Sequence, residues 1–151
     1  MEHLLTISEI TVQYKPKKAH RPKIFTTANE AMTIARQFFP DDTIELQERF
    51  IVVYLNRANR VIGVYLVSVE GITGTVADTR LILSVALKVA ATSIILVYNH
   101  PSGNLTPSRA DLELTQKIKE AASYMDIQVI DHLILSPEKG IYYSFAEEGL
   151  I

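Results

Sequence analysis

The spacing of hydrophobic residues changes along the chain, and each change predicts a different element. Residues 10–14 alternate between apolar and polar side chains, which predicts a half-buried edge strand that stops at the proline-rich segment after it. Apolar residues within 31–38 recur instead at helical spacing. Thr27 and Glu30 form a capping-box pattern before this run, and Pro40 follows it. We therefore expect the first helix between these two boundaries.

The next part of the chain predicts a hairpin followed by a second helix. Two apolar, β-branched stretches, 50–55 and 60–69, are separated by the turn-forming sequence 56–59. Residues 71–75 have the composition of a loop, and Asp78 is then placed to cap a helix. The apolar positions of that helix fall on one face and are Ile82, Val85, Ala86 and Val89.

A short, fully apolar run at 94–97 is typical of a central strand that is covered on both faces. It leads into 98–108, a polar loop with two prolines, at the strand end where α/β folds often place their chemistry. Ser108 is expected to cap a third helix, and strands are expected near 127–135 and 141–145. The core positions predicted for that helix are Leu114, Ile118, Ala121 and Met125. The fold class is α/β or α+β, a mixed sheet flanked by helices.

Composition narrows the class of protein. The chain has 151 residues, 48% of them hydrophobic and 21% charged, which is the composition of one ordinary globular domain rather than a disordered chain or a coiled coil. It has no apolar stretch long enough to span a bilayer and no signal peptide pattern, so a cytoplasmic protein without membrane contact is expected. The absence of cysteine excludes thiolate chemistry, so any metal must bind to His, Asp, Glu or Tyr.

Positive charge is concentrated near the start of the chain. Five of the 15 basic residues lie within 15–23, and the remaining ten face 17 acidic residues elsewhere. We accordingly divide the chain into a strand and basic arm at 1–26 and a domain at 27–151. The arm has two interpretations, a solvated linker or a weak contact with the phosphates of DNA. The acidic remainder gives no support to nucleic-acid binding.

Several polar residues around the predicted site loop admit a structural and a functional interpretation. Ser108 followed by Asp111 matches a helix cap, which alone would account for both residues. His100 after a strand is most simply a hydrogen-bonded loop residue, and Glu48 before a strand is most simply solvated. Their order along the chain is what favours a functional interpretation.

Tyr98-Asn99-His100-Pro101, followed after six residues by Ser108-x-x-Asp111, resembles the JAMM signature H-x-H-P-x6-S-x-x-D of the JAB/MPN metallohydrolases. Further matches are similar to the JAB domain of the bacterial RadC family, a family named for DNA repair. They are Asn99 to Gly103, Thr106 to Ser108, Asp131 to Leu133, and Ser144 to Gly149. The resemblance runs from about Gln47 to the C-terminus. The helix-hairpin-helix segment of typical RadC proteins has no counterpart in this sequence.

The resemblance implies a single JAB/MPN-like domain that hydrolyses amide or isopeptide bonds in a protein or peptide substrate. It makes His100 and Asp111 ligands of a zinc ion, with Ser108 as the hydroxyl beside the oxyanion and Glu48 as the acid/base. These residue types suit that chemistry, because a catalytic zinc takes three protein ligands and a water whose pKa it lowers toward 7. A nearby carboxylate then relays the proton, and a hydroxyl donor stabilises the oxyanion.

The sequence departs from the motif at Tyr98, which replaces the first histidine ligand. A phenol reaches further than an imidazole and must lose a proton of pKa about 10 to bind a metal well. Three states follow: a weak or altered zinc site, a site completed by another residue, or a metal-free domain that serves as a binding scaffold, in DNA repair or mobile elements. His132 is the other available donor, and its apolar strand favours a structural role.

Overall fold

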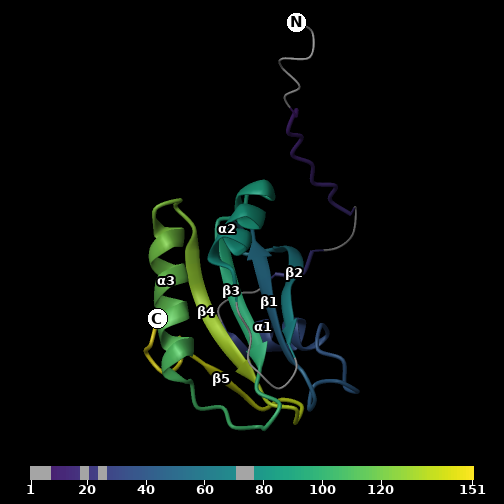
Figure 1. Ribbon diagram of the computed structural model, residues 1–151, viewed down its shortest axis with the longest axis vertical. Helices are drawn as coiled ribbons and strands as arrows, with labels where there is room; N and C mark the ends of the chain where they lie inside the picture. Colours follow the sequence, from purple (N-terminus) through teal and green to yellow (C-terminus); the bar gives the residue numbers. More distant parts are fainter. Residues whose placement is uncertain (1–7, 18–20, 24–26, 71–76) are drawn as a thin grey trace, which may run out of the picture.

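The computed structural model describes residues 8–17, 21–23, 27–70 and 77–151, and it arranges them as a sheet between helices (Figure 1). The helices are α1 (Ala28–Arg36), α2 (Thr79–Lys88) and α3 (Arg109–Ser123). The strands are β1 (Glu48–Leu55), β2 (Val61–Glu70), β3 (Ser93–Asn99), β4 (Gln128–Leu135) and β5 (Tyr142–Ser144). The predicted mixed sheet flanked by helices is confirmed.

The five strands lie in the order β2-β1-β3-β4-β5, with β3 in the middle. β3 pairs in parallel with β4 and antiparallel with β1, while β1 and β2 form the predicted antiparallel hairpin. The turn of that hairpin is closed by the Asn56 side chain, which accepts hydrogen bonds from the backbone N–H groups of Ala58 and Arg60. Asn59 completes it with φ 57°, a left-handed conformation that asparagine tolerates.

Helices cover both faces of the sheet, which explains why every residue of β3 is buried. One face carries α2 and α3, and its core includes Phe50, Ile94 and Leu96. The other face carries α1, and its core includes Ile51 and Ile95. Neighbouring residues of a strand therefore enter opposite cores, as the pleat of a β-strand requires.

The N-terminal segment differs from the prediction. Residues 8–17 have no regular secondary structure and extend away from the sheet in Figure 1, with Ile10 87% and Val12 70% exposed. The segment contacts the sheet through Tyr14, whose hydroxyl donates a hydrogen bond to the Ile62 carbonyl of β2 at 3.2 Å. The edge strand predicted at 10–14 is therefore absent, because alternation alone supplies no partner strand and Pro16 interrupts the segment.

The predicted caps of all three helices are confirmed: the side chains of Thr27, Asp78 and Ser108 accept hydrogen bonds from the first turns. The first helix ends earlier than expected, so Phe38 is 42% exposed and Phe39 takes the buried position. Met125, predicted in the core of the third helix, lies beyond the end of α3 and is 44% exposed. The loop predicted at 71–75 lies outside the described residues.

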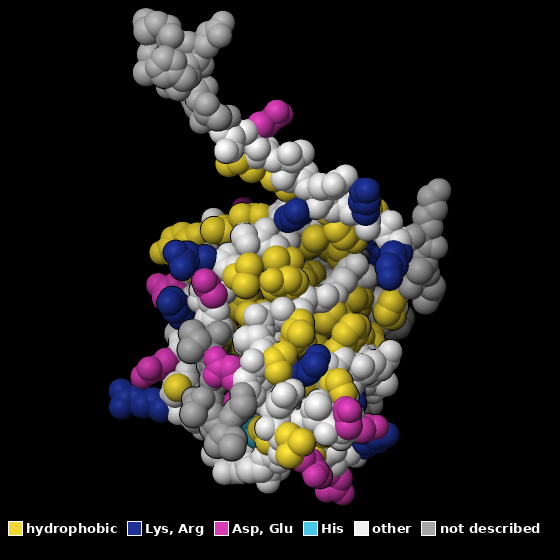
Figure 2. Space-filling model, turned by 45° about the vertical axis from the view of Figure 1, so that its right-hand side comes forward, with side chains coloured by type: hydrophobic (Ala, Val, Ile, Leu, Met, Phe, Trp, Pro, Cys, Tyr) yellow, Lys and Arg dark blue, Asp and Glu magenta, His cyan; other side chains and the backbone are white. Residues whose placement is uncertain are grey.

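Figure 2 shows hydrophobic side chains gathered on the side of the molecule that includes the edge strand β2. Leu66 and Val69 of this strand are 42% and 41% exposed.

No helix in the described ranges is long and apolar enough to cross a membrane.

Candidate functional site

The sheet register brings three of the predicted site residues together. Phe50 of β1 lies opposite Tyr98 of β3 in the antiparallel pair, so the next alternate positions outward are Glu48 and His100. Because side chains alternate along a strand, these four residues belong to the same face of the sheet, the one covered by α2 and α3. The antiparallel pairing therefore places a carboxylate and an imidazole at the same end of the sheet.

The loop after β3 fixes the orientation of the His100 ring. Its Nδ1 atom hydrogen-bonds to the backbone carbonyl of Asn104, which can only accept, so Nδ1 carries the proton. The backbone N–H of Gly103 closes the turn by donating to the His100 carbonyl at 3.0 Å, and Gly103 has φ 80°, which favours glycine. The His100 Nε2 atom is thereby directed to Asp111, 3.6 Å from its Oδ2 atom.

Ser108 and Asp111 form the capping box that the sequence predicted. The Ser108 Oγ atom accepts from the Asp111 backbone N–H at 3.1 Å, and the Asp111 Oδ2 atom accepts from the Ser108 backbone N–H at 2.7 Å. The same carboxylate oxygen also faces His100. Asp111 therefore caps α3 and also faces His100, so its structural role does not exclude the predicted functional one.

The charged forms of Asp111 and His100 stabilise each other. Burial alone would raise the pKa of Asp111, but the contacts of His100, Tyr98 and Ser108 with its carboxylate hold that pKa well below its usual value. Burial alone would lower the pKa of His100, and the Asp111 carboxylate, the Asn104 carbonyl and the nearby Glu48 together outweigh it, so the pKa of His100 is raised. Asp111 therefore stays ionised to lower pH than a free carboxyl, and His100 keeps its proton to higher pH than a free imidazole.

Tyr98 is buried in the middle of this group and is 2% exposed. Its ring stacks with Phe50, with the ring centroids 5.9 Å apart, and lies 5.0 Å from the His100 ring. Burial raises the pKa of its phenol strongly, and the neighbouring carboxylates of Asp111 and Glu48 raise it further. The hydroxyl neighbours the Asp111 carboxylate, and it makes no hydrogen bond of normal geometry to any described residue. Tyr98 is consequently neutral near pH 7.

Two neighbouring hollows share Glu48. The smaller has a volume of about 220 Å³ and is lined by Glu48, Phe50, Ala77, Tyr98, Ala110, Asp111 and Leu114. The larger has a volume of about 500 Å³, and its lining includes Glu48, His100 and Ser108. The five predicted site residues therefore line two neighbouring hollows at the end of β3, rather than one simple cleft. Their chemical roles stay predictions.

Asn99 positions the segment that carries Glu48, a role that we did not predict from the sequence. Its side chain is fully buried, and its Nδ2 atom donates to the carbonyls of Ile44 and Gln47, both at 2.9 Å. Its Oδ1 atom accepts from the backbone N–H of Arg49 at 2.7 Å. These bonds bracket Glu48. The sequence does show an asparagine next to the motif histidine. It does not show which groups this side chain bonds to, because they lie about 50 residues away in the sequence.

His132 is fully buried behind the site, where its ring stacks with Phe145 at 4.6 Å and meets Tyr98 edge to face at 4.9 Å. Its Nδ1 atom hydrogen-bonds to Thr115, whose hydroxyl donates to the Asp111 carbonyl. Burial lowers the pKa of His132 to about 3, so the ring is neutral at pH 7. These contacts are those of a packed, neutral core residue.

The donors at the site do not fit a catalytic zinc ion, which takes three protein ligands and a water. His100 and Asp111 provide two donors, and the first ligand position of the motif holds the neutral phenol of Tyr98, a poor ligand while it stays protonated. Across the described ranges, no three His, Cys, Asp or Glu residues are grouped so that they could hold a metal ion. The zinc site implied by the motif is therefore incomplete.

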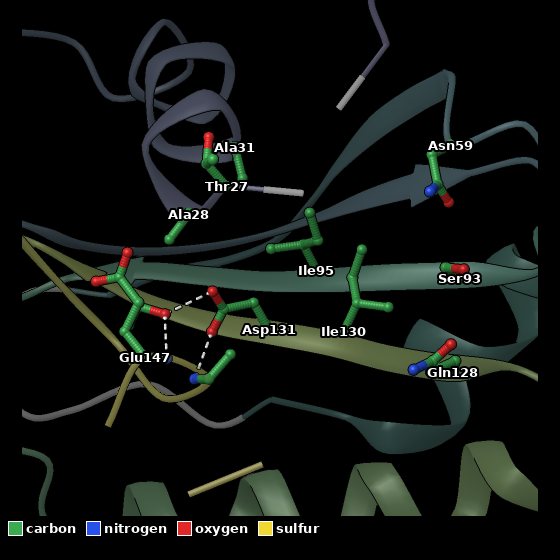
Figure 3. Close-up of a pocket in the computed structure, with 12 residues that line it drawn as sticks. Thr27, Ala28, Ala31, Asn59, Ser93, Ile95, Gln128, Ile130, Asp131 and Glu147 are labelled. Carbon is green, nitrogen blue, oxygen red and sulfur yellow. Dashed lines mark hydrogen bonds between the residues drawn. The ribbon is translucent and has the colours of Figure 1, made fainter. Parts of the chain in front are cut away.

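A separate cavity of about 520 Å³ lies on the opposite face of the sheet, beside α1. Figure 3 shows Thr27, Ala28 and Ala31 across this cavity from Ile130 and Asp131. The Asp131 carboxylate accepts from the Ser144 hydroxyl at 2.7 Å and from the backbone N–H groups of His132 and Ala146. Asp131 thus anchors the chain after β5 to β4, which gives this part of the sequence match a structural role.

Comparison with known proteins gives relatives along most of the chain. A model of the RadC-like JAB domain family matches residues 25–150. A UPF0758 protein of Flavobacterium johnsoniae is 41% identical over 128 residues, which are 85% of this chain and 54% of that protein. UPF0758 proteins of Streptococcus thermophilus and Streptococcus sanguinis are 42% and 46% identical, over 76% and 68% of this chain and 50% and 44% of theirs.

The matches cover most of this chain but only part of each relative. The chain spans about half the length of the curated relatives it matches, so the comparison concerns one domain rather than a whole relative. The family model covers nearly every residue from the start of α1 to the C-terminus, including all five site residues. The chain belongs to the RadC-like JAB domain family.

Proposed function

We propose that this chain is a RadC-type metallohydrolase homologue that has kept the substrate cleft and lost the zinc-dependent step. It binds a protein or peptide segment in the two hollows around Glu48 and does not hydrolyse it. The hollows lie at the end of a central strand, between a polar loop and the first turn of α3. Clefts of this kind commonly bind ligands in folds with helices on both faces of a sheet.

The observation that carries the proposal is the burial of Tyr98 at the first ligand position of the motif. Its phenol is neutral, and its ring is packed between Phe50 and His100. Turning the ring away to admit another ligand would disrupt this packing, which in protein interiors is as dense as in organic crystals. The residue that removes a zinc ligand is thus also part of the core.

A second candidate function is hydrolysis of amide or isopeptide bonds, as the family resemblance implies. It is favoured by the joint position of Glu48, His100 and Ser108 around one hollow. In that function Glu48 would act as the acid/base and Ser108 would stabilise the oxyanion. The zinc ion would then depend on His100 and Asp111 with water, and its affinity would be low.

Two measurements on the full chain distinguish these functions. Metal analysis after purification without chelator should find well below one zinc per chain, whereas stoichiometric zinc would overturn the metal-free proposal. A peptide-library selection should enrich ligands for the wild-type protein that are lost with Ala110→Phe. Ala110 is exposed and lines the smaller hollow, so a phenyl ring there obstructs it without entering the core.

The matched control for the selection is Gln116→Phe, which adds the same ring at an exposed position of α3 outside both hollows. Ligands that bind wild type and Gln116→Phe but not Ala110→Phe support the binding function. Equal enrichment on all three proteins would refute it. A link to DNA repair or mobile elements stays a prediction of the family name.

A further inference from the structure

The smaller hollow combines apolar walls with polar atoms at one side. Phe50, Leu114 and the methyl groups of Ala77 and Ala110 provide the apolar surface. Glu48, Asp111 and the hydroxyl-bearing ring of Tyr98 provide the polar part. Its volume of about 220 Å³ is below the roughly 300–1,000 Å³ of pockets that hold drug-sized ligands or cofactors. A single side chain of a bound peptide is the size of ligand that it admits.

The charge around this hollow is negative. Two carboxylates line it, and Glu45 lies in the neighbouring hollow that shares Glu48. His100 is the one group among these linings that can carry positive charge, since the described residues lining the two hollows include no lysine or arginine. At most one imidazolium therefore opposes three carboxylates, and a cation is the complementary ligand.

The Tyr98 hydroxyl gives a second, independent indication of a ligand. Tyr98 lines the hollow and is 2% exposed, and its hydroxyl oxygen has no hydrogen-bond partner of normal geometry among the described residues. Buried polar groups in proteins are nearly always hydrogen-bonded, and exceptions need an explanation. A donor that enters the hollow would satisfy this oxygen, which can accept while its proton points to Asp111.

We propose that the smaller hollow binds the side chain of a lysine in the partner peptide, with its ammonium group between Glu48, Asp111 and the Tyr98 hydroxyl. This assignment rests on the proposed binding function and names its ligand. An ammonium is compact and has three donors, which match three acceptors. The guanidinium of arginine is larger and planar, and its donors point in fixed directions within that plane. The lysine stem would lie along Phe50 and Leu114, and the ammonium would gain further attraction from the aromatic rings.

The proposal is tested by titrating the 15N-labelled protein with three blocked peptides in the presence of EDTA, followed by NMR. The peptides are identical except for one central residue, which is lysine, Nε-acetyl-lysine or norleucine. Acetylation removes the charge, and norleucine keeps the stem without the ammonium. The lysine peptide should bind at least about tenfold more tightly than either analogue, because hydrogen bonds to charged groups are the stronger ones. The amide chemical shifts that change on binding of the lysine peptide should be those of residues around the smaller hollow.

Variants locate the interaction. Glu48→Gln should weaken binding of the lysine peptide about tenfold or more, and Tyr98→Phe, which removes only the hydroxyl, should weaken it several-fold. Glu120→Gln removes a carboxylate at an exposed position of α3 outside both hollows and should leave binding unchanged. Thermal unfolding of each variant checks that a loss of binding is not a loss of folding.

The possible results separate this inference from the function on which it rests. Equal affinity for the lysine and norleucine peptides would overturn lysine recognition. Failure of all three peptides to bind would also overturn it. In both cases a library selection that depends on Ala110 would still support peptide binding, whereas stoichiometric zinc and turnover by the wild-type protein would refute the proposed function itself.

Discussion

Replacement of Asn99 by alanine should both destabilise the domain and displace Glu48. The substitution removes the three hydrogen bonds by which the buried side chain holds the carbonyls of Ile44 and Gln47 and the N–H of Arg49. Each bond contributes about 1 kcal/mol net, and buried groups left without a partner cost about as much or more. We expect the free energy of unfolding to fall by about 3 kcal/mol.

The assay is urea unfolding monitored by circular dichroism, with the loss of stability read from the transition midpoint at constant slope. Asn29→Ala is the matched control, because Asn29 is exposed and should tolerate alanine within about 0.5 kcal/mol. Asn99→Asp adds a second test: its carboxylate can still accept from Arg49 but cannot donate to the two carbonyls. A loss at Asn99→Ala no larger than at Asn29→Ala would refute the positioning role.

Three further predictions concern the site and the arm. The stability difference between wild type and His100→Gln should shrink as pH rises above 6.5. The raised folded-state pKa of His100 contributes stability that is fully present below the unfolded pKa of 6.5 and is lost as pH rises through the folded pKa. A constant difference in urea midpoint from pH 6 to about 9 would contradict this. Ser108→Ala should cost about 1 kcal/mol in urea unfolding and Ser108→Gly only a few tenths, and equal losses would argue against the cap. Any DNA binding by the basic segment 15–23 should have a log–log salt slope of about −4 to −5 for five phosphates in electrophoretic titrations, so strong binding that is flat in salt would exclude a contact by charge alone.

The elements that the sequence predicted well are those with a local cause. The hairpin turn depends on Asn56 and Asn59, and each helix start depends on a capping side chain a few residues from its partners. The burial of β3 follows from a run of apolar residues that only a covered central strand can accommodate. In these cases, local propensity and the global fold agree.

The features that the sequence did not reveal depend on distant parts of the chain. Alternation at 10–14 is typical of a strand, but a strand needs a neighbour, and these residues form no ladder with any part of the chain that the structure describes. The role of Asn99 depends on Ile44 and Gln47, which the sheet brings beside it. The order of site residues predicted that they gather at one end of β3, but only the packed structure places Tyr98 in the core, where its phenol stays neutral.

The central claim is that Tyr98 removes a zinc ligand, and a competitive zinc titration tests it most directly. Wild type and Tyr98→His are titrated in one buffer against a chromophoric chelator, so that both affinities are measured on the same scale. Loss even of a group that only supports a ligand typically costs about 10- to 100-fold in metal affinity, so restoring the ligand itself should raise zinc affinity by at least about tenfold. Equal affinities would mean that Tyr98 binds zinc or that another residue completes the site, and would contradict the account.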